Sequence, residues 1–419
     1  MKYLALVDCD SYYCSCERIF SPNLNKIPVI VLSNNDGCAI ALTPEAKAVG
    51  IKMGTPYYQL KGLIKKYNVA VFSSNYELYG DISKRIFKIL QDFTPCIENY
   101  SIDESFMELD TNTKPIDDTC KEIVRRTKSY CSIPVKVGVA KTKTLTKVAA
   151  DLVKKNKIKS KYKILLDPDE IAEVLSDYPI EDIWGIGRQL TKKLNSIGKT
   201  TACQFLRLDD DYIRKHFSIN MLRTKWELQG RPCIDMETIP QTRKNHCHSR
   251  AFGYPVSEYQ DLKESIVSYT STAASNIRGM KLKAQSISIY IRTNFFNKEL
   301  PQYSNSITLS LPNAANDTMT LVKYAVEGLG RIFREGYLYK KSSILLNDLV
   351  DEKLNQLNFF EQPDPANDRL SKVMDQINNE YGKGAVQLGS TGIKKQKWQL
   401  QRNLISKRYT TRIDELFKI

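Results

Sequence analysis

The chain has 419 residues, more than one hydrophobic core usually supports, so we expect roughly two to four domains. Its formal charge of +15 and pI near 9.1 favour a polyanionic partner. No apolar run approaches the roughly 20 residues of a membrane-spanning helix, and the first residues reach Asp8 too soon for a signal peptide. Nucleic acid is therefore favoured over a membrane, and a cytoplasmic location is expected.

The cysteine and histidine content disfavours a zinc site. The ten cysteines include no Cys-x-x-Cys pair, and the three histidines are His216, His246 and His248. We interpret the cysteines as reduced thiols. The pair His246 and His248 has no further cysteine or histidine ligand nearby, so a structural role is favoured for both.

Residues 1–170 alternate between short strands and helices, which predicts an α/β or α+β layer structure. Strands are expected at 3–9, 28–33, 69–73, 134–139 and 162–166, and helices at 80–92, 117–130 and 142–155.

Three acids stand out within this region. Asp8 ends a buried-strand pattern, and Asp103 and Glu104 lie at the bend between two short strand patterns. Carboxylates at the ends of adjacent core strands repel one another unless a cation lies between them, and oxygen-only sites suit Mg²⁺ or Mn²⁺. This predicts a metal site of the kind used in phosphoryl transfer. On spacing alone, two unrelated surface acids remain an alternative.

Residues 169–240 favour short helices without a clear strand. Within them Gly185 and Gly187 form a turn before an amphipathic helix at 188–197, the pattern of a helix-hairpin-helix, whose backbone N–H groups can bind a phosphate. Arg188 and three lysines close by favour DNA binding over a simple tight turn; these lysines are Lys192, Lys193 and Lys199.

Residues 243–350 predict a β-α-β-β-α-β unit with both helices on one face of the sheet. Strands are expected at 247–254, 286–293, 306–311 and 342–350, and helices at 258–281 and 316–335. Ile287, Ile289 and Ile291 alternate with polar residues that include Arg292, so one face should pack on the helices. The polar face is either solvated or lies along a phosphate backbone.

Beyond residue 351 the pattern weakens. Residues 356–360 (QLNFF) precede a stretch at 362–365 that is typical of a flexible connector. Residues 394–412 hold seven Lys or Arg and no acid. We interpret this tail as a segment that binds nucleic acid or a protein partner.

These features together resemble the Y-family translesion DNA polymerases, and within them the UmuC type, the catalytic subunit of DNA polymerase V. The resemblance covers nearly the whole chain. Its specific carriers are 32–38 (LSNNDGC), 72–79 (FSSNYELY), 100–104 (YSIDE), 184–187 (WGIG) and 406–412 (SKRYTTR).

The resemblance implies an active site in which Asp8, Asp103 and Glu104, with the backbone carbonyl of Cys9, hold two Mg²⁺ ions, for which Mn²⁺ can substitute. Tyr13 falls where the family keeps an aromatic residue as a steric gate against ribonucleotides; the alternative is a core tyrosine.

Two lysines fall at the family's nucleotide-binding positions. Lys154 matches the triphosphate-binding lysine, although the surrounding lysines are also typical of a solvated basic face. Lys47 stands where many members have a phosphate-gripping Arg, and it lacks the bidentate fork. Pro44 replaces a Tyr that contacts the triphosphate in many members.

The implied fold is a multi-domain α+β right hand. It comprises a palm (1–19 and 76–168), small fingers (20–75), a helical thumb with the helix-hairpin-helix (169–240), a little finger (243–350) and a C-terminal tail (351–419). DNA contacts are expected at Gly185, Gly187, Arg188 and Arg292, and a sliding-clamp contact through Gln356, Leu357, Phe359 and Phe360. The implied partners are primer-template DNA, dNTP, the clamp, a processed UmuD-like subunit and RecA, at the bacterial nucleoid.

The predicted function is error-prone translesion synthesis, in the SOS response to DNA damage. Two alternatives of other classes remain open. A non-catalytic DNA-binding recruiter would use the same binding modules, and the intact carboxylates disfavour it. A nucleotidyl cyclase could carry paired acids on a similar hairpin, and the basic charge disfavours it.

Overall fold

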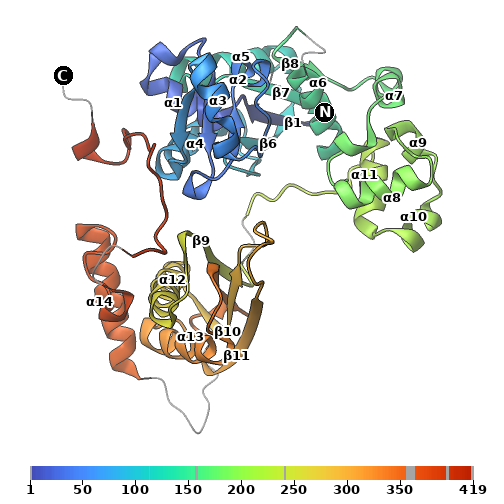
Figure 1. The fold of residues 1–419 in the computed structure, drawn as a ribbon. Helices are drawn as coiled ribbons and strands as arrows, with labels where there is room; N and C mark the ends of the chain where they lie inside the picture. The colour runs from blue at the N-terminus through green and yellow to red at the C-terminus, as the bar shows by residue number, and fades with distance from the viewer. Residues whose placement is uncertain are drawn as a thin grey trace. The chain divides into compact units, whose positions relative to one another are not determined.

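The computed structural model describes residues 2–112, 114–155, 159–239, 242–354, 364–392 and 396–416. The chain divides into two compact units. The first unit contains Met1–Ser33, Gly37–Gln241 and Leu404–Ile419, and the second contains Asn34–Asp36 and Thr242–Asn403. Both units are discontinuous in sequence (Figure 1).

The first unit is built around a five-stranded sheet with the strand order β5-β6-β1-β7-β8. β1 is antiparallel to both of its neighbours, whereas β7 and β8 are parallel. The strands are β1 (Lys2–Cys9), β5 (Ile97–Asn99), β6 (Glu104–Asp110), β7 (Val135–Ala140) and β8 (Tyr162–Ile164).

Helices cover both faces of this sheet, which explains why the sequence of β1 is apolar at successive positions. Val7 belongs to a core that includes buried side chains of α4 (Tyr76–Gln91) and α5 (Ile116–Cys131). Leu6 points the other way and packs with Phe106 and with Ala150 of α6 (Lys143–Lys154). Because side chains alternate along a strand, Asp8 lies on the α6 side.

A second, three-stranded sheet has the order β3-β2-β4, with β2 antiparallel to β3 and parallel to β4. Its apolar core includes Ile30, Leu32 and Leu60. The strands are β2 (Val29–Leu32), β3 (Ala39–Leu42) and β4 (Ala70–Ser73), and the helices of this region are α1 (Tyr12–Phe20), α2 (Pro44–Ala48) and α3 (Tyr57–Tyr67).

The helices that follow share an apolar core with one face of α6, and in it Leu194, Phe205 and Leu222 are fully buried. They are α7 (Pro168–Ser176), α8 (Arg188–Ser196), α9 (Ala202–Leu206), α10 (Asp210–His216) and α11 (Ile219–Leu228). The expected run of short helices is therefore present.

The second unit has the predicted β-α-β-β-α-β order. Its antiparallel strands follow the order β11-β10-β12-β9, and Figure 1 shows α12 beside α13. Ile287, Ile289 and Ile291 are fully buried, as their alternation predicted. The elements are β9 (His246–Val256), α12 (Tyr259–Gly279), β10 (Leu282–Thr293), β11 (Ser304–Ala315), α13 (Thr318–Ile332) and β12 (Tyr339–Asn347).

The last strand has the expected length but begins and ends three residues before the expected 342–350. Asp348 adopts a positive φ of 50°, which turns the chain after β12. The short strand β13 (Val350–Asp351) then pairs with β10 instead of continuing β12.

The prediction of a flexible connector at 362–365 is wrong for Asp364 and Pro365, the two residues of that stretch that the structure describes. Asp364 caps the helix α14 (Pro365–Tyr381), accepting from the Ala366 amide at 2.9 Å, and Pro365 opens it. Asp375 on this helix pairs with Arg278 through two bonds of 2.7 and 2.9 Å. The tail is also divided between the units, since its described part up to Asn403 lies in the second and residues 404–416 lie in the first.

Gly138 in β7 lies opposite Leu6, under α6. A Cβ there would touch the Thr146 carbonyl oxygen and stand 2.5 Å from the Ala150 amide nitrogen. We therefore expect Gly138→Ala to lower the free energy of unfolding by roughly 3 kcal/mol, measured by chemical denaturation. In the control Gly80→Ala the new Cβ, on α4, meets nothing within 4 Å. It should raise that free energy by about 0.5–1 kcal/mol. Equal effects would contradict the close approach of α6 to β7.

Candidate active site

The three predicted carboxylates meet at one corner of the five-stranded sheet. Asp8 in β1 is the register partner of Glu104 in β6, and the Cys9 amide donates to the Asp103 carbonyl at 2.9 Å. Asp8 is only 5% exposed, whereas Asp103 and Glu104 are half-buried. The Cys9 side chain is buried. The backbone therefore places the three acids side by side, as the sequence predicted.

The bend that presents Asp103 and Glu104 is closed by Ser101. Its Oγ donates to Asp103 Oδ1 at 2.6 Å and accepts from the amides of Asp103 and Glu104 at 3.3 and 3.1 Å. The Ser101 amide also donates to the Glu104 carbonyl at 3.0 Å. A short polar side chain that bonds to the following backbone in this way fixes a tight turn.

Lysines of α6 pair with these acids. Lys154 Nζ donates to Asp8 Oδ2 at 2.9 Å, and Lys147 Nζ donates to Glu104 Oε2 at 2.8 Å. Lys147 also lies over the Tyr100 ring, 4.6 Å from its centroid. The two lysines are seven residues apart, so two helical turns bring them to the same face of α6.

Burial dominates the electrostatics of Asp8. It raises the pKa of the Asp8 carboxyl to about 6, against the opposing effect of Lys154 and with smaller contributions from Glu104 and Asp103. For Lys154, burial lowers the pKa but the attraction of Asp8 outweighs it, so the pKa is raised overall. The ammonium of Lys154 thus supplies the positive charge that the cluster of acids requires.

The donor set fits a divalent cation. Asp8 Oδ1 is buried and has no hydrogen-bond partner among the described residues, which leaves one carboxylate oxygen for a further ligand. Carboxylate oxygens are the ligands that Mg²⁺ prefers. Within the described ranges, no three His, Cys, Asp or Glu side chains already form a metal-binding group. The backbone thus brings the three acids together as expected. Their side chains pair with Ser101, Lys147 and Lys154.

Tyr13 lies on α1 in a cluster of aromatic rings. Its ring stacks on Tyr79 with centroids 4.6 Å apart and an interplanar angle of 18°, and Tyr76 meets both rings edge-on. Burial raises the pKa of Tyr13 to about 12. The ring is half-buried, so it is fixed in place and still partly accessible.

Lys47 and Pro44 lie on the short helix α2. Pro44 occupies its first position, where proline's missing N–H costs no hydrogen bond, and Thr43 caps the helix. The Lys47 side chain is exposed. Pro44 thus has a structural role in starting the helix that carries Lys47.

The glycine turn before α8 has the expected form. Gly185 adopts a φ of 91°, and Gly187 caps α8 without any side-chain hydrogen bond. Ile186 is buried between the two exposed glycines, and Arg188 is exposed at the first helical position. The first-turn backbone N–H groups of α8 are therefore not occupied by a capping side chain.

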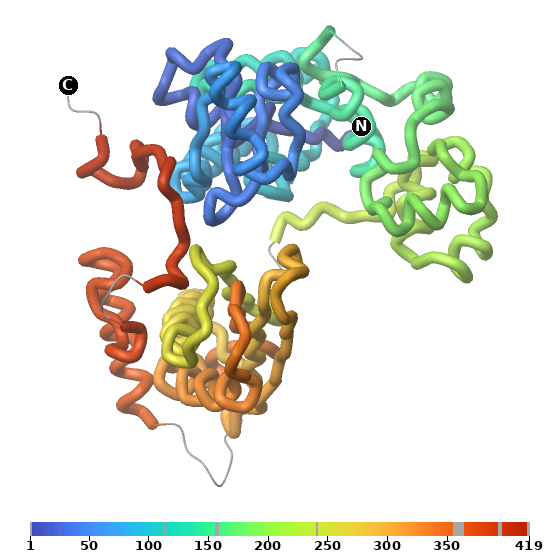
Figure 2. The backbone as a smooth tube through the Cα atoms, in the orientation of Figure 1, coloured from blue at the N-terminus to red at the C-terminus, as the bar shows by residue number. Residues whose placement is uncertain are grey.

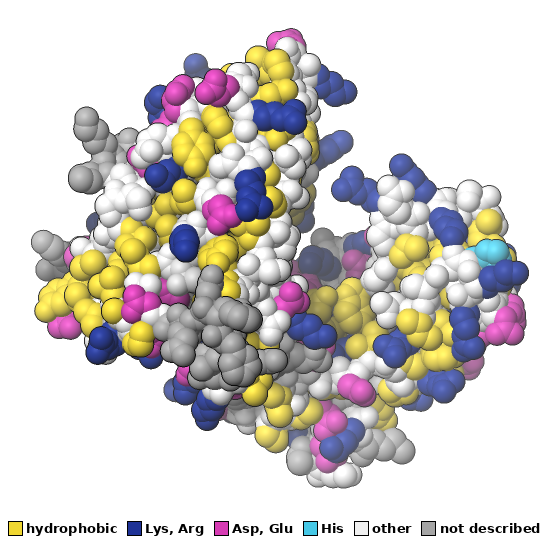
Figure 3. Space-filling view, turned by 90° about the horizontal axis from the view of Figure 1, so that it is seen from below, with side chains coloured by type: hydrophobic (Ala, Val, Ile, Leu, Met, Phe, Trp, Pro, Cys, Tyr) yellow, Lys and Arg dark blue, Asp and Glu magenta, His cyan; other side chains and the backbone are white. Residues whose placement is uncertain are grey.

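Arg292 lies in β10 of the second unit. It faces Ser304 of β11 and Lys341 of β12 in register, and its guanidinium carbon lies 4.8 Å from the Phe295 ring centroid. Figure 3 shows one face of the molecule, on which Lys and Arg side chains recur among apolar and uncharged ones.

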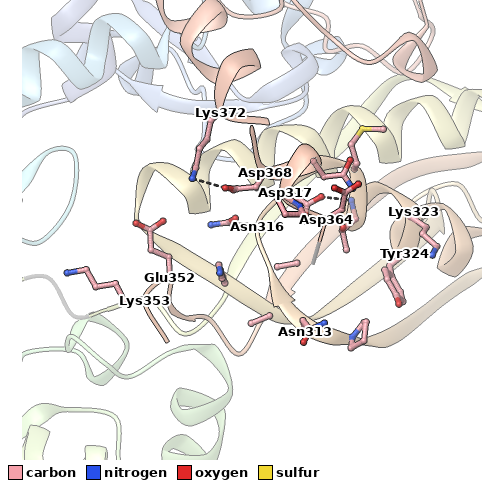
Figure 4. Close-up of a pocket in the computed structure, with 18 residues that line it drawn as sticks. Asn313, Asn316, Asp317, Lys323, Tyr324, Glu352, Lys353, Asp364, Asp368 and Lys372 are labelled. Carbon is pink, nitrogen blue, oxygen red and sulfur yellow. Dashed lines mark hydrogen bonds and ion pairs between the residues drawn. The ribbon is translucent and has the colours of Figure 1, made fainter. Parts of the chain in front are cut away.

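A hollow of about 870 Å³ lies in the second unit, at the ends of β11, α13 and α14 (Figure 4). Lys372 and Asp368 on its wall pair at 2.8 Å. The charged lining consists of four lysines and four acids: Lys283, Lys323, Lys353, Lys372, Asp317, Glu352, Asp364 and Asp368. This balance of charge does not favour a polyanionic nucleotide.

The predicted clamp-binding residues Gln356, Leu357, Phe359 and Phe360 lie outside the described residues. No helix in the described ranges is long and apolar enough to cross a membrane.

Sequence reasoning missed the partners of the predicted site residues. The pairing of Lys147 with Glu104 could have been inferred from its spacing to Lys154 on one helical face. The stack of Tyr79 on Tyr13 depends on the packing of α1 against α4, for which the sequence gives no local signal.

Family models match most of the chain. The impB/mucB/samB family matches residues 7–151 and its C-terminal domain matches 243–359. Between them the IMS family HHH motif matches 168–199, and a domain of unknown function, DUF4113, matches 368–419.

Curated relatives are similar over almost the full length. Protein UmuC of Salmonella typhimurium is 37% identical over 420 residues, which is 99% of both chains. Protein SamB of Salmonella typhimurium is 37% identical over 414 residues, or 97% of both. DNA polymerase IV of Bacillus velezensis is 25% identical over 401 residues, or 93% of both.

Among solved structures, a Y-family DNA polymerase chimera matches with a TM-score of 0.67 at 20% identity, over 84% of this chain and all of that chain. At this identity the match shows the fold, a right-hand polymerase. The chain belongs to the impB/mucB/samB family and is a UmuC-type translesion DNA polymerase of the Y family. The family, fold class and enzyme class predicted from the sequence are therefore confirmed.

The burial of Asp8 beside two other acids predicts a cost in stability. In a buffer with chelator, Asp8→Asn should raise the free energy of unfolding at neutral pH by about 1–3 kcal/mol, since it removes a buried charge whose ionisation is disfavoured. Denaturant titration measures this. Asp10→Asn is the matched control, because Asp10 pairs with Lys136 at 2.5 Å. Its loss should lower that free energy by about 1 kcal/mol. Destabilisation by both variants would contradict the electrostatic account of Asp8.

Proposed function

We propose that this chain extends a primer by template-directed nucleotidyl transfer at the corner formed by Asp8, Asp103 and Glu104. The observation that carries the proposal is the register pairing of Asp8 with Glu104, with Asp103 at the same bend and lysines of α6 on the same acids. Its substrates would be primer-template DNA and dNTP.

We further propose that the metal is Mg²⁺, with two ions held by Asp8, Asp103, Glu104 and the Cys9 carbonyl, and that Mn²⁺ can substitute. Held by these residues, such ions would lower the pKa of the primer 3′-hydroxyl and would offset negative charge on the triphosphate and the leaving pyrophosphate. The buried, unpartnered Asp8 Oδ1 supports this assignment. The rest of the catalysis is positioning by the chain's own residues.

Lys154 and Lys47 are proposed to bind the triphosphate. Lys154 ends α6, and its side chain is 53% exposed although its ammonium contacts Asp8. An exposed lysine with a flexible stem can exchange the carboxylate for a phosphate oxygen. Lys47 offers a point charge from α2.

The DNA is proposed to be held by two modules. The backbone around Gly185 and Gly187, with Arg188, would bind phosphates of the duplex. The hydroxyl-rich face of the second unit's sheet, with Arg292, would lie along the backbone without reading bases. We assign the domains of a right-hand polymerase accordingly: the palm to 1–19 and 76–168, the fingers to 20–75, the thumb to 169–240 and the little finger to 243–350.

The partners are proposed from family membership. Relatedness to UmuC supports a processed UmuD-like subunit and a role in the SOS response, at DNA in the nucleoid. A sliding clamp that binds residues 356–360 and a RecA filament that contacts the tail are further proposals.

Asp103→Asn tests the catalytic proposal. We expect primer extension across an abasic template to fall by at least about 100-fold, since one anionic ligand is lost. Extension assays with the accessory subunits present measure it. Asp177→Asn, at an exposed position after α7, should leave extension unchanged. Full activity of Asp103→Asn would defeat the assignment, and absence of any metal-dependent incorporation by the unmodified protein would favour the recruiter.

Tyr13→Ala tests the sugar gate. Removing the ring should admit ribonucleotides, lowering the preference for dNTP over rNTP by roughly 100-fold, because a steric barrier to the 2′-hydroxyl is lost. Competitive single-nucleotide incorporation measures the preference. Tyr13→Phe keeps the ring and should keep the preference. An unchanged preference in Tyr13→Ala would remove Tyr13 from this role.

A further inference from the structure

Residues 404–412 belong to the first unit, although they follow the second unit in the sequence; we name this segment the C-terminal strap. The Ser73 amide donates to the Leu404 carbonyl at 2.9 Å, and the Leu404 amide donates to Ser73 Oγ at 3.0 Å. Ser73 and Ile405 form a parallel bridge, which adds the strap to the edge of β4. Figure 2 shows this red segment beside the blue N-terminal part of the chain.

Ser406 is the residue through which the strap contacts the interior. Asn75 Nδ2 donates to its carbonyl at 3.1 Å and to its Oγ at 3.0 Å. The Ser406 hydroxyl in turn donates to Glu17 Oε1 at 3.0 Å. Asn75 also caps α4 through its Oδ1, so one side chain fixes both the helix and the strap.

Glu17 is a buried carboxylate, 2% exposed, on α1. Its Oε1 accepts from Tyr79 at 2.6 Å as well as from Ser406. Burial raises the pKa of Glu17 to about 7, and the two hydroxyl donors oppose this. In the described part of the chain no Lys or Arg forms an ion pair with it, so those two hydroxyls are the groups that satisfy it.

Glu17 connects the strap to the proposed sugar gate. Tyr79, which donates to Glu17, is fully buried and stacks directly on Tyr13. Tyr13, Glu17 and Phe20 recur at intervals of four and three residues, so they share one face of α1. Tyr409 of the strap stacks on Phe20 with centroids 4.5 Å apart. The strap therefore contacts two members of this row, and the third is the gate.

We propose that Ser406 and Glu17 are positioning residues for Tyr13, and that the C-terminal strap thereby sets the polymerase's discrimination between deoxyribose and ribose. The inference rests on the proposed role of Tyr13. The strap lies within residues 368–419, which match a domain of unknown function. The proposal therefore gives part of that domain a role at the nucleotide site.

The test compares hydroxyl variants in the full chain with its accessory subunits. Ser406→Ala leaves Glu17 with a single donor, and we expect the dNTP to rNTP preference to fall about three- to tenfold. The loss should reside mainly in KM for dNTP rather than in kcat, because the metal-binding acids are untouched. Ser406→Thr restores the hydroxyl and should restore the preference. Thr411→Ala removes a hydroxyl from an exposed strap position and should change nothing.

Two measurements, thermal unfolding and the preference for dNTP over rNTP, distinguish the ways in which the proposal could fail. Thermal unfolding of each variant establishes whether it is folded; should Ser406→Ala not fold, Tyr79→Phe supplies the same test from the other donor to Glu17. If Tyr13→Ala leaves the preference unchanged, the gate itself is wrong. If Tyr13→Ala lowers the preference while folded Ser406→Ala or Tyr79→Phe does not, the positioning role is overturned. In the double variant Tyr13→Ala with Ser406→Ala, we expect no loss beyond that of Tyr13→Ala alone.

Discussion

The packing of α6 on the central sheet is the contact on which the acidic corner depends, because it brings lysines to three acids that lie close together. Ionised carboxylates this close destabilise one another, and burial of Asp8 adds to that cost. Lys147 and Lys154 offset it from a single face of α6. They reach the acids because α6 packs directly on the backbone at Gly138, where no side chain intervenes. The absence of a side chain at Gly138 in β7 thus lets the lysines of α6 reach the acids of β1 and β6.

The two units use different strategies to present their functional groups. The central sheet of the first unit is covered by helices on both faces, so its polar groups lie at strand ends, where the apolar pattern stops. The second unit packs α12 and α13 on one face of its sheet, and the other face carries hydroxyls together with Arg292. The first arrangement gathers a few polar groups at one corner of the sheet, and the second spreads them along one face.

The sequence predicted best those elements whose signal is local. The alternation of Ile287, Ile289 and Ile291 requires one buried face, and the stop at Asp8 after an apolar run marks a strand end. The helix α14, which was missed, has Ser371 as its one fully buried residue, and its position depends on the pairing of Asp375 with Arg278, about a hundred residues away. The partners of Tyr13 were missed for the same reason. Long-range pairings specify side-chain positions, and they leave no periodicity in the sequence.

The strap has a consequence for the order in which the protein is made. Asn75 and Ser406, which bond to each other, are separated by 331 residues. Chains are synthesised from the N-terminus, and early domains generally fold as they emerge. Here Glu17 precedes Ser406, its second hydroxyl donor, by 389 residues. The nascent first unit therefore lacks one of the two hydroxyl donors to Glu17 until the strap has been synthesised, long after the residues of the tyrosine cluster.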